Sequence, residues 1–285
     1  MRTRALAWFA AVAGCALLVS CAGDAAPGAA DSPGGTPSAT AAAPPGPGEY
    51  LAGRSATVDL AADPRAVVVL VPGGAWTQIW DPEGFAALAD ALAEAGLAVV
   101  QITCGTAATQ AYYPRPVDDV ACAVAYAAEQ VPDVPVVVVG HSAGAVLAVL
   151  VGLVPERGDL ECPYEPRAAD GVVGLAGPYD VGRTGIGENL FGVPEGDDPE
   201  LWRDSNPLTW ADERAEVPFL LARGEADSQV PVFFTRDMAE ALEAGGHDVT
   251  VEVLPGREHN DMYRADVVGA LVVGWVDAVV VGRGP

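Results

Sequence analysis

The most constraining feature of this 285-residue sequence is a series of short, valine-rich apolar segments separated by stretches that suit helices. Most of these segments lack strict alternation of apolar and polar residues, which is typical of strands buried on both faces of a parallel sheet. Alternation of such strands with helices predicts an α/β fold with a doubly wound, mostly parallel sheet and right-handed connections. The predicted strands are Ala66–Val71, Ala98–Thr103, Val134–Val139, Gly171–Leu175, Val217–Leu221 and Val249–Leu254.

The segments between these strands carry helix signals. Pro82–Ala95 has apolar residues spaced by three and four, and it stops before Gly96, a residue suited to the position after a helix. Pro116–Gln130 begins with a proline beside acidic residues, which are favourable at a helix N-terminus. Arg54–Leu60 alternates instead and predicts an antiparallel edge strand. The other predicted helices are Ala143–Val154, Pro231–Ala244 and Met262–Val280.

The N-terminal region resembles an export signal. Arg2 and Arg4 precede the apolar segment Ala5–Val19, which is shorter than the roughly 20 residues of a membrane-spanning helix, so residues 1–20 are predicted to be a signal peptide. The sequence Leu-Val-Ser-Cys ending at Cys21 resembles a bacterial lipobox. We therefore expect lipidation of Cys21 and anchoring of the exported chain to the bacterial membrane at the cell surface, with ordinary secretion as the alternative.

A polar, small-residue segment follows the expected anchor. Residues 21–49 are dominated by Ala, Pro, Gly, Ser and Thr, and they lack enough large apolar side chains to form a core. The composition predicts a disordered tether and leaves residues 50–285 as one domain. Three cysteines, Cys104, Cys122 and Cys162, lie in this domain, and one disulfide among them is expected in an oxidising compartment; the sequence does not say which two pair.

The charge of the chain excludes one class of partner. With 39 acidic and 15 basic residues the formal net charge is −24, so no basic face can form to neutralise phosphates. We therefore expect no nucleic-acid partner. The acidity is better explained by its contribution to solubility.

One serine lies between a predicted buried strand and a predicted buried helix, in the sequence Gly-His-Ser-Ala-Gly centred on Ser142. Gly-x-Ser-x-Gly at such a junction is typical of the sharp turn that lifts a nucleophilic serine above the C-terminal edge of a sheet. The N-terminus of the following helix favours the negative charge that develops there. A serine that only caps the helix is the alternative interpretation.

A serine nucleophile needs a base, and the chain has three histidines. His259 follows the last predicted strand, at the same edge of the sheet as Ser142, and is the candidate base. His141 is adjacent to Ser142 on a tight turn and is expected to point elsewhere. His247 lies in a predicted surface turn, where a solvated polar residue is the simpler interpretation.

The base in turn needs an orienting carboxylate. Asp227 follows the penultimate predicted strand within a few residues and is the candidate, with Glu225 as the nearby competitor. The oxyanion needs backbone N–H donors. Ala143 is one, because it follows the nucleophile, and Gly74 or Ala75 in the glycine-rich loop after the first central strand is the other. A plain tight turn is the alternative for that loop.

Together these motifs resemble the α/β-hydrolase fold, and within it esterases with a His-Gly-Gly-Gly-Trp or His-Gly-Gly-x-Trp loop, among them hormone-sensitive-lipase-like, arylformamidase-like and feruloyl-esterase-like proteins. The sequence "PGGAW" stands where that family has His-Gly-Gly-x-Trp, with Trp76 at the tryptophan position and Pro72 in place of the histidine. "YYPRPVDDV" and "SNPLTW" resemble further family segments. The resemblance runs from Ala66 to the last helix and implies a Ser-His-Asp hydrolase with Trp76 close to the substrate.

We therefore expect a serine hydrolase that cleaves small to medium carboxylic esters, a small-molecule ester as its partner, and no cofactor or metal, since no His/Cys cluster has ligand spacing. An amidase or arylformamidase, or a peptidase, would use the same triad. A non-catalytic surface binding protein is an alternative of another class. It is disfavoured because Ser142, Asp227, His259 and the glycine-rich loop occur together.

One long connection separates the fourth and fifth central strands. Residues 181–216 show no strong strand or helix pattern, and a long irregular segment in a compact domain is typical of a binding loop or small cap. Its aromatic residues, Phe191, Trp202 and Trp210, are candidates for substrate binding. Packing of the insertion onto the domain is the equally weighted alternative.

Overall fold

The computed structural model describes residues 48–79, 82–155 and 162–283. The predicted signal peptide, the expected lipidation site Cys21 and nearly all of the predicted tether lie outside these residues. Glu49, placed by the sequence at the end of the tether, already belongs to the first strand. Within the described ranges, no helix has both the length and the apolar character needed to cross a membrane.

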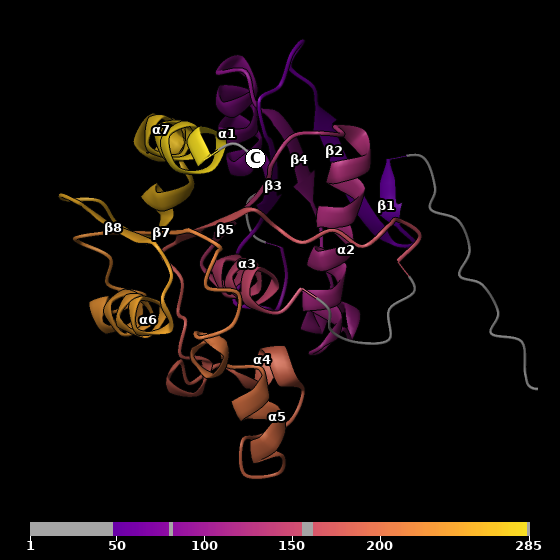
Figure 1. The fold of residues 1–285 in the computed structure, drawn as a ribbon. Helices are drawn as coiled ribbons and strands as arrows, with labels where there is room; N and C mark the ends of the chain where they lie inside the picture. The colour runs from indigo at the N-terminus through magenta and orange to yellow at the C-terminus, as the bar shows by residue number, and fades with distance from the viewer. Residues whose placement is uncertain (1–47, 80–81, 156–161, 284–285) are drawn as a thin grey trace, which may run out of the picture. The chain divides into compact units, whose positions relative to one another are not determined.

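Eight strands form a single sheet in the order β1-β2-β4-β3-β5-β6-β7-β8 (Figure 1). All neighbours from β4 to β8 are parallel, whereas β1, β2 and β4 pair antiparallel. The predicted mostly parallel α/β fold is therefore confirmed. The strands are β1 (Glu49–Leu51), β2 (Arg54–Asp59), β3 (Val67–Val71), β4 (Ala98–Ile102), β5 (Val136–His141), β6 (Gly171–Leu175), β7 (Phe219–Gly224) and β8 (Val249–Leu254).

The alternating strand of the sequence is β2, but the prediction that it forms the edge of the sheet is wrong. The three residues of β1 lie outside it and pair through Glu49 with Ser55. Tyr50 in β1 is fully buried, and its hydroxyl donates a hydrogen bond to the Thr103 carbonyl at 2.9 Å. A strand of three residues is too short to produce a detectable period, so the pattern could not reveal it.

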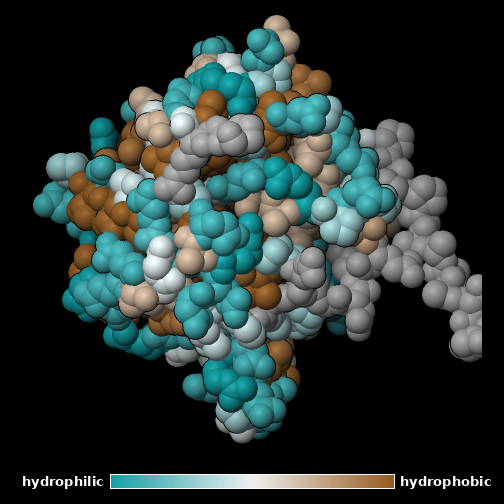
Figure 2. All heavy atoms as spheres, in the orientation of Figure 1, coloured by the Kyte–Doolittle hydropathy of each residue, from teal (hydrophilic) through white to brown (hydrophobic). Residues whose placement is uncertain are grey.

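Helices cover both faces of the sheet, which explains why the strands lack alternation. In β3, Val67, Val69 and Val71 belong to the core under α2 (Arg115–Gln130), α3 (Ala143–Leu153) and α6 (Val232–Gly245). Val68 and Leu70 belong to the core under α1 (Pro82–Glu94) and α7 (Ala270–Trp275) (Figure 1). On the face shown in Figure 2, hydrophilic residues predominate and hydrophobic ones form separate small areas.

The C-terminal helical region is less regular than the single predicted helix Met262–Val280. It begins with the five-residue 3₁₀ helix His259–Tyr263, after which Arg264 adopts an extended conformation with φ −78° and ψ 134°. A π-helical turn, α7, and a second π-helical turn then follow in succession. The break at Arg264 separates the turn that carries His259 from the helix that packs on the sheet.

The insertion after β6 contains short helices, so the prediction of an irregular segment is wrong. Asp198 and Asn206 each precede a proline and accept a backbone N–H through the side chain, from Leu201 at 3.0 Å and Leu208 at 3.2 Å. Helices of three to six residues hold too few apolar positions to show a period. The helices are η2 (Val181–Arg183), α4 (Glu188–Phe191), α5 (Pro199–Asp204) and η3 (Pro207–Trp210) (Figure 1).

Two of the three domain cysteines form a disulfide. Cys122 in α2 is bonded to Cys162, which lies before β6, with their Cα atoms 5.5 Å apart. Cys104 is a buried free thiol, and burial raises its pKa to about 12. The pairing that the sequence left open is therefore Cys122 with Cys162.

Candidate active site

The candidate nucleophile lies where the order of the strands changes direction. The chain passes from β3 outward to β4 and then returns to β5 on the other side of β3. Open α/β sheets bind ligands at the carboxyl ends of the strands at such a switch point. Ser142 directly follows β5, and the glycine-rich loop Val71–Trp76 follows the adjacent β3. The topology therefore places the two predicted motifs side by side.

The turn at Ser142 is strained and tightly packed. Ser142 has φ 54° and ψ −121°, outside the region that residues with a side chain favour. A Cβ on Gly140 would lie 2.2 Å from the Gly144 carbonyl oxygen, and one on Gly144 would lie 2.4 Å from the Val71 carbonyl oxygen. Both glycines are therefore required by the close approach of helix α3 to β3 and β5, as the motif predicts.

A continuous line of hydrogen bonds joins the three candidate triad residues. His259 Nε2 lies 3.0 Å from Ser142 Oγ, and His259 Nδ1 lies 2.9 Å from Asp227 Oδ2. The carboxylate can only accept, so it fixes the tautomer with the proton on Nδ1 and leaves Nε2 free to accept the serine proton. His259 and Asp227 are both buried.

Asp227, rather than Glu225, reaches the histidine. Burial alone would raise the pKa of the Asp227 carboxyl, but hydrogen bonds from His259 and from the backbone of Val230 and Gln229 outweigh it and hold that pKa below its usual range. The two backbone N–H groups donate to Oδ1, each at 2.9 Å. Glu225 is exposed and accepts the Gly256 N–H at 3.0 Å.

The backbone N–H groups of Ala75 and Ala143 are the candidate oxyanion donors. Ala143 begins helix α3, and its N–H and that of Ala75 have no acceptor among the described residues. Both residues line the same cavity as Ser142, whereas Gly74 does not. The Gly74 carbonyl accepts the Thr77 N–H at 3.0 Å, and Gly74 has φ 136°. Of the two predicted donors in this loop, Ala75 is the one at the cavity, and Gly74 shapes the turn.

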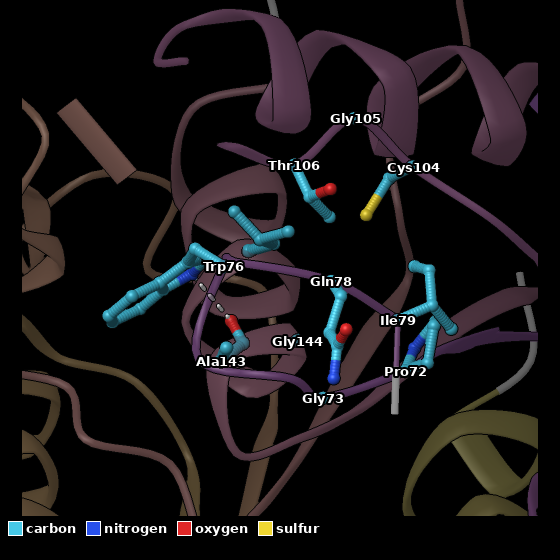
Figure 3. A pocket seen from close by; sticks show the side chains of 11 residues that line it. Pro72, Gly73, Trp76, Gln78, Ile79, Cys104, Gly105, Thr106, Ala143 and Gly144 are labelled. Carbon is cyan, nitrogen blue, oxygen red and sulfur yellow. Dashed lines mark hydrogen bonds between the residues drawn. The ribbon is translucent and has the colours of Figure 1, made fainter. Parts of the chain in front are cut away.

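Trp76 connects the two donor segments. Its indole N–H donates to the Ala143 carbonyl at 3.2 Å, as Figure 3 shows. Its own carbonyl accepts the Ala107 N–H at 2.8 Å, which ties the loop to the segment after β4. The tryptophan is buried and also lines the cavity beside Ser142. Behind it lies a space of only about 10 Å³ between this loop, helix α3 and Cys104 (Figure 3).

The cavity at Ser142 has a volume of about 150 Å³. Among the described residues that line it, His259 is the only one with an ionisable side chain. No group of three or more His, Cys, Asp or Glu side chains in the described part of the chain is arranged to hold a metal ion. The lining residues are Ala75, Trp76, Ser142, Ala143, Pro178, Thr184, Ile186, Gln229, Val230, Phe234 and His259.

The aromatic residues of the insertion do not line this cavity. Phe191 and Trp202 are buried against one another with ring centroids 4.5 Å apart. The indole N–H of Trp210 donates to the Asp204 carbonyl at 2.7 Å, within the insertion itself. These contacts favour the packing alternative over substrate binding. The insertion instead contributes Thr184 and Ile186 to the wall, two residues in a glycine-rich stretch that carries no signal of a pocket.

Two histidines outside the candidate triad are buried, and for His247 this contradicts the prediction of a solvated surface residue. His247 is buried, not solvated: its Nδ1 lies 2.9 Å from the Val217 carbonyl oxygen and its ring packs edge-on against Phe219. His141 is also buried, and its Nε2 lies 3.1 Å from the carbonyl oxygen of His259, within hydrogen-bond distance. Burial, and then the nearby His259 ring, lower the pKa of His141 to about 3. The sequence pattern could not predict these contacts, because each histidine is a single polar residue next to a strand and its partner lies far away in the chain.

The low pKa of His141 predicts a specific acid dependence of stability. An unfolded histidine has a pKa of about 6.5, so between about pH 6 and pH 4 the unfolded chain binds one more proton than the folded one. The contribution of this group is therefore fully present above pH 6.5 and is lost as the pH falls. Relative to a His141→Gln variant, the wild type should lose about 1.4 kcal/mol per pH unit in this window, measured by urea unfolding. Parallel acid dependences would contradict the assignment.

Comparison with known proteins places the chain in a family. Residues 59–242, more than half of the chain, match the BD-FAE family. Over 221 residues the chain is 30% identical to Esterase LipC of Mycobacterium tuberculosis (strain ATCC 25618 / H37Rv), an alignment that covers 70% of this chain and 54% of that protein. The chain therefore spans only about half the length of this relative.

Solved structures support the fold. A thermophilic esterase of Thermogutta terrifontis, with propionate bound, matches with a TM-score of 0.65 and 20% identity, covering 81% of this chain and 90% of that one. An acetyl ester-xyloside bifunctional hydrolase from Caldicellulosiruptor lactoaceticus matches with a TM-score of 0.65 and 19% identity, covering 79% and 88%. The family match, together with the fold and the sharp turn at Ser142, leads to one conclusion: this chain belongs to the BD-FAE family of α/β-hydrolase esterases.

Proposed function

We propose that this protein is a serine esterase that hydrolyses carboxylic esters of small to medium size. The observation that carries the proposal is the hydrogen-bonded line Ser142–His259–Asp227, which ends at a cavity that Ala75 and Ala143 also line. Such an arrangement supplies a nucleophile, a base, an orienting carboxylate and an oxyanion site in one place.

The reaction follows from these positions. Ser142 Oγ attacks the ester carbonyl carbon while His259 Nε2 takes the hydroxyl proton. The resulting tetrahedral oxyanion accepts hydrogen bonds from the Ala75 and Ala143 N–H groups. The C–O bond to the alcohol breaks as His259 returns the proton to the leaving oxygen, which leaves an acyl group on Ser142. Water, deprotonated by His259, attacks this acyl group and releases the acid, and Asp227 stabilises the imidazolium formed in each half.

Labelling and turnover test the proposal directly. The wild type should hydrolyse p-nitrophenyl acetate and react covalently with a fluorophosphonate probe at Ser142. Amide or peptide substrates cleaved faster than matched esters would favour an amidase or a peptidase on the same residues. Absence of both labelling and turnover would leave a non-catalytic binding protein as the better explanation.

The cavity size predicts the acyl preference. A cavity of about 150 Å³ is of the size that holds benzene, that is, about six carbon atoms, and lies below the range for drug-sized ligands. We expect kcat/KM to be at least about tenfold higher for a four-carbon than for an eight-carbon acyl ester, since a few methylenes in a tight pocket decide such ratios. Ile186→Ala should raise the relative rate of the eight-carbon ester several-fold.

The matched control for Ile186 is Leu60, another exposed large apolar residue. Leu60 follows β2, which runs antiparallel to β4, so it lies near the amino ends of the parallel strands and away from Ser142. Leu60→Ala should leave the chain-length profile unchanged. Identical profiles for wild type and Ile186→Ala would show that the insertion does not limit the acyl chain. A preference of the wild type for long-chain triglycerides would contradict the small-pocket proposal itself.

The location of the protein is a separate proposal that rests on the sequence alone. The charged n-region, the short apolar segment and the lipobox-like sequence at Cys21 support export and lipid anchoring at the bacterial membrane. The full-length protein, expressed in a bacterium, should sediment with membranes, and Cys21→Ser should move it to the soluble fraction or leave it unprocessed. Wild-type protein found entirely in the soluble fraction would contradict the anchor.

A further inference from the structure

We infer that His141 is a positioning residue for catalysis: it ties the backbone of the segment that carries His259 to the strand that carries Ser142. The inference deepens the proposed esterase function and rests on it. His141 does not touch the reacting atoms in this arrangement, so its effect would be exerted through the placement of His259.

The first observation is a hydrogen bond between the two segments. His141 is the last residue of β5, and its Nε2 lies 3.1 Å from the backbone carbonyl oxygen of His259, at the start of the 3₁₀ helix. A carbonyl oxygen only accepts, so the proton is on Nε2 of His141. The imidazole is neutral at the pH of any ordinary assay, and the bond does not depend on its charge.

The second observation is the packing around the His141 ring. Its centroid lies 4.8 Å from that of His259 and 4.9 Å from that of Tyr263, which belongs to the same 3₁₀ helix. On the side of the oxyanion loop, a Cβ on Gly73 would lie 3.0 Å from His141 Nδ1 and 3.1 Å from the Ser142 Cβ. The ring therefore packs where three segments meet: the turn at Ser142, the glycine-rich loop Val71–Trp76 and the 3₁₀ helix that begins at His259.

The third observation is that the segment that carries His259 is hydrogen-bonded to each of the two segments that carry the other triad residues. From the loop that carries Asp227, the Ala226 N–H donates to the Arg257 carbonyl at 2.9 Å. From the strand that carries Ser142, His141 donates to the His259 carbonyl. The imidazole of His259 must bridge Asp227 and Ser142 with both nitrogens in line. A shift of about 1 Å in such a position can cost about a hundredfold in rate.

Three substitutions of His141 separate the hydrogen bond from the packing. Glutamine can place its amide N–H near the position of Nε2, phenylalanine keeps an aromatic ring but donates no hydrogen bond, and asparagine is polar but too short to reach the His259 carbonyl. For His141→Phe and His141→Asn we expect kcat on p-nitrophenyl acetate to fall about 10- to 100-fold with KM changed less than about twofold. His141→Gln should restore kcat to within about fivefold of the wild type.

His247 provides a matched control. It is likewise a buried histidine hydrogen-bonded to a backbone carbonyl and packed against an aromatic ring, but it lies before β8, at the edge of the sheet away from Ser142. His247→Phe should affect thermal unfolding to a similar extent as His141→Phe while leaving kcat unchanged. This contrast separates a loss of stability from a loss of alignment.

The outcomes are distinguishable from those that concern the proposed function. If the wild type hydrolyses esters and His141→Asn does so within threefold of the same kcat, the inference is overturned and the esterase proposal stands. The same holds if His247→Phe loses as much kcat as His141→Phe, or if glutamine behaves like asparagine. A wild type without turnover or probe labelling would overturn the esterase proposal and this inference together.

Discussion

Ser142→Ala is expected to lower kcat for ester hydrolysis by on the order of a millionfold, the loss found where triads have been dissected. Alanine removes only the hydroxyl and keeps the Cβ, so the turn at φ 54° and the contacts of its flanking glycines are unchanged. The fold should therefore persist, as judged by circular dichroism and thermal unfolding. Labelling by a fluorophosphonate probe should disappear.

The double variant Ser142→Ala, His259→Ala gives a sharper test of the shared role. The effects of substituting residues that act as one unit do not add, so the double variant should be no slower than Ser142→Ala alone. Ser228→Ala is the control, because Ser228 is an exposed serine next to Asp227 that does not line the cavity. Near-normal turnover by Ser142→Ala, or a large loss in Ser228→Ala, would overturn the assignment of the nucleophile.

The sequence alone suffices to bring the three candidate triad residues together, because parallel strands end at one common edge of the sheet. Ser142, Asp227 and His259 each follow a different strand, and the sheet order puts β5, β7 and the end of β8 on that common edge. Chain order and strand pattern therefore suffice to bring such residues together in a doubly wound fold. The choice between Gly74 and Ala75 was not accessible in this way, because it depends on which N–H the turn leaves free.

The features that the sequence missed are those decided by packing between distant segments. His247 and His141 are polar residues whose burial depends on carbonyl groups 30 and 118 positions away. Phe191 and Trp202 pack against one another, but the same two residues in the same sequence could equally have lined a pocket. Tertiary context decided each of these positions, and neither periodicity nor propensity carries that information.

Asp227→Asn is expected to lower kcat about ten-thousandfold, whereas Glu225→Gln should change it less than about twofold. Asp227 accepts from His259 at Oδ2 and from the backbone of Gln229 and Val230 at Oδ1. An asparagine in the same place keeps its oxygen toward the two backbone donors and turns its NH₂ group toward His259. The imidazole must then carry its proton on Nε2, where it can no longer accept the proton of Ser142.

The opposite orientation of that asparagine does not rescue the site, because its NH₂ group would then face two backbone N–H donors. Glu225 differs in kind, since its carboxylate is exposed and accepts only from Gly256 among its described hydrogen bonds. Steady-state kinetics on p-nitrophenyl acetate and the rate of fluorophosphonate labelling should both show the Asp227→Asn defect, with the fold retained. A larger loss in Glu225→Gln than in Asp227→Asn would mean that the carboxylate that orients His259 in solution is Glu225, and that the hydrogen bond at Oδ2 does not carry the chemistry.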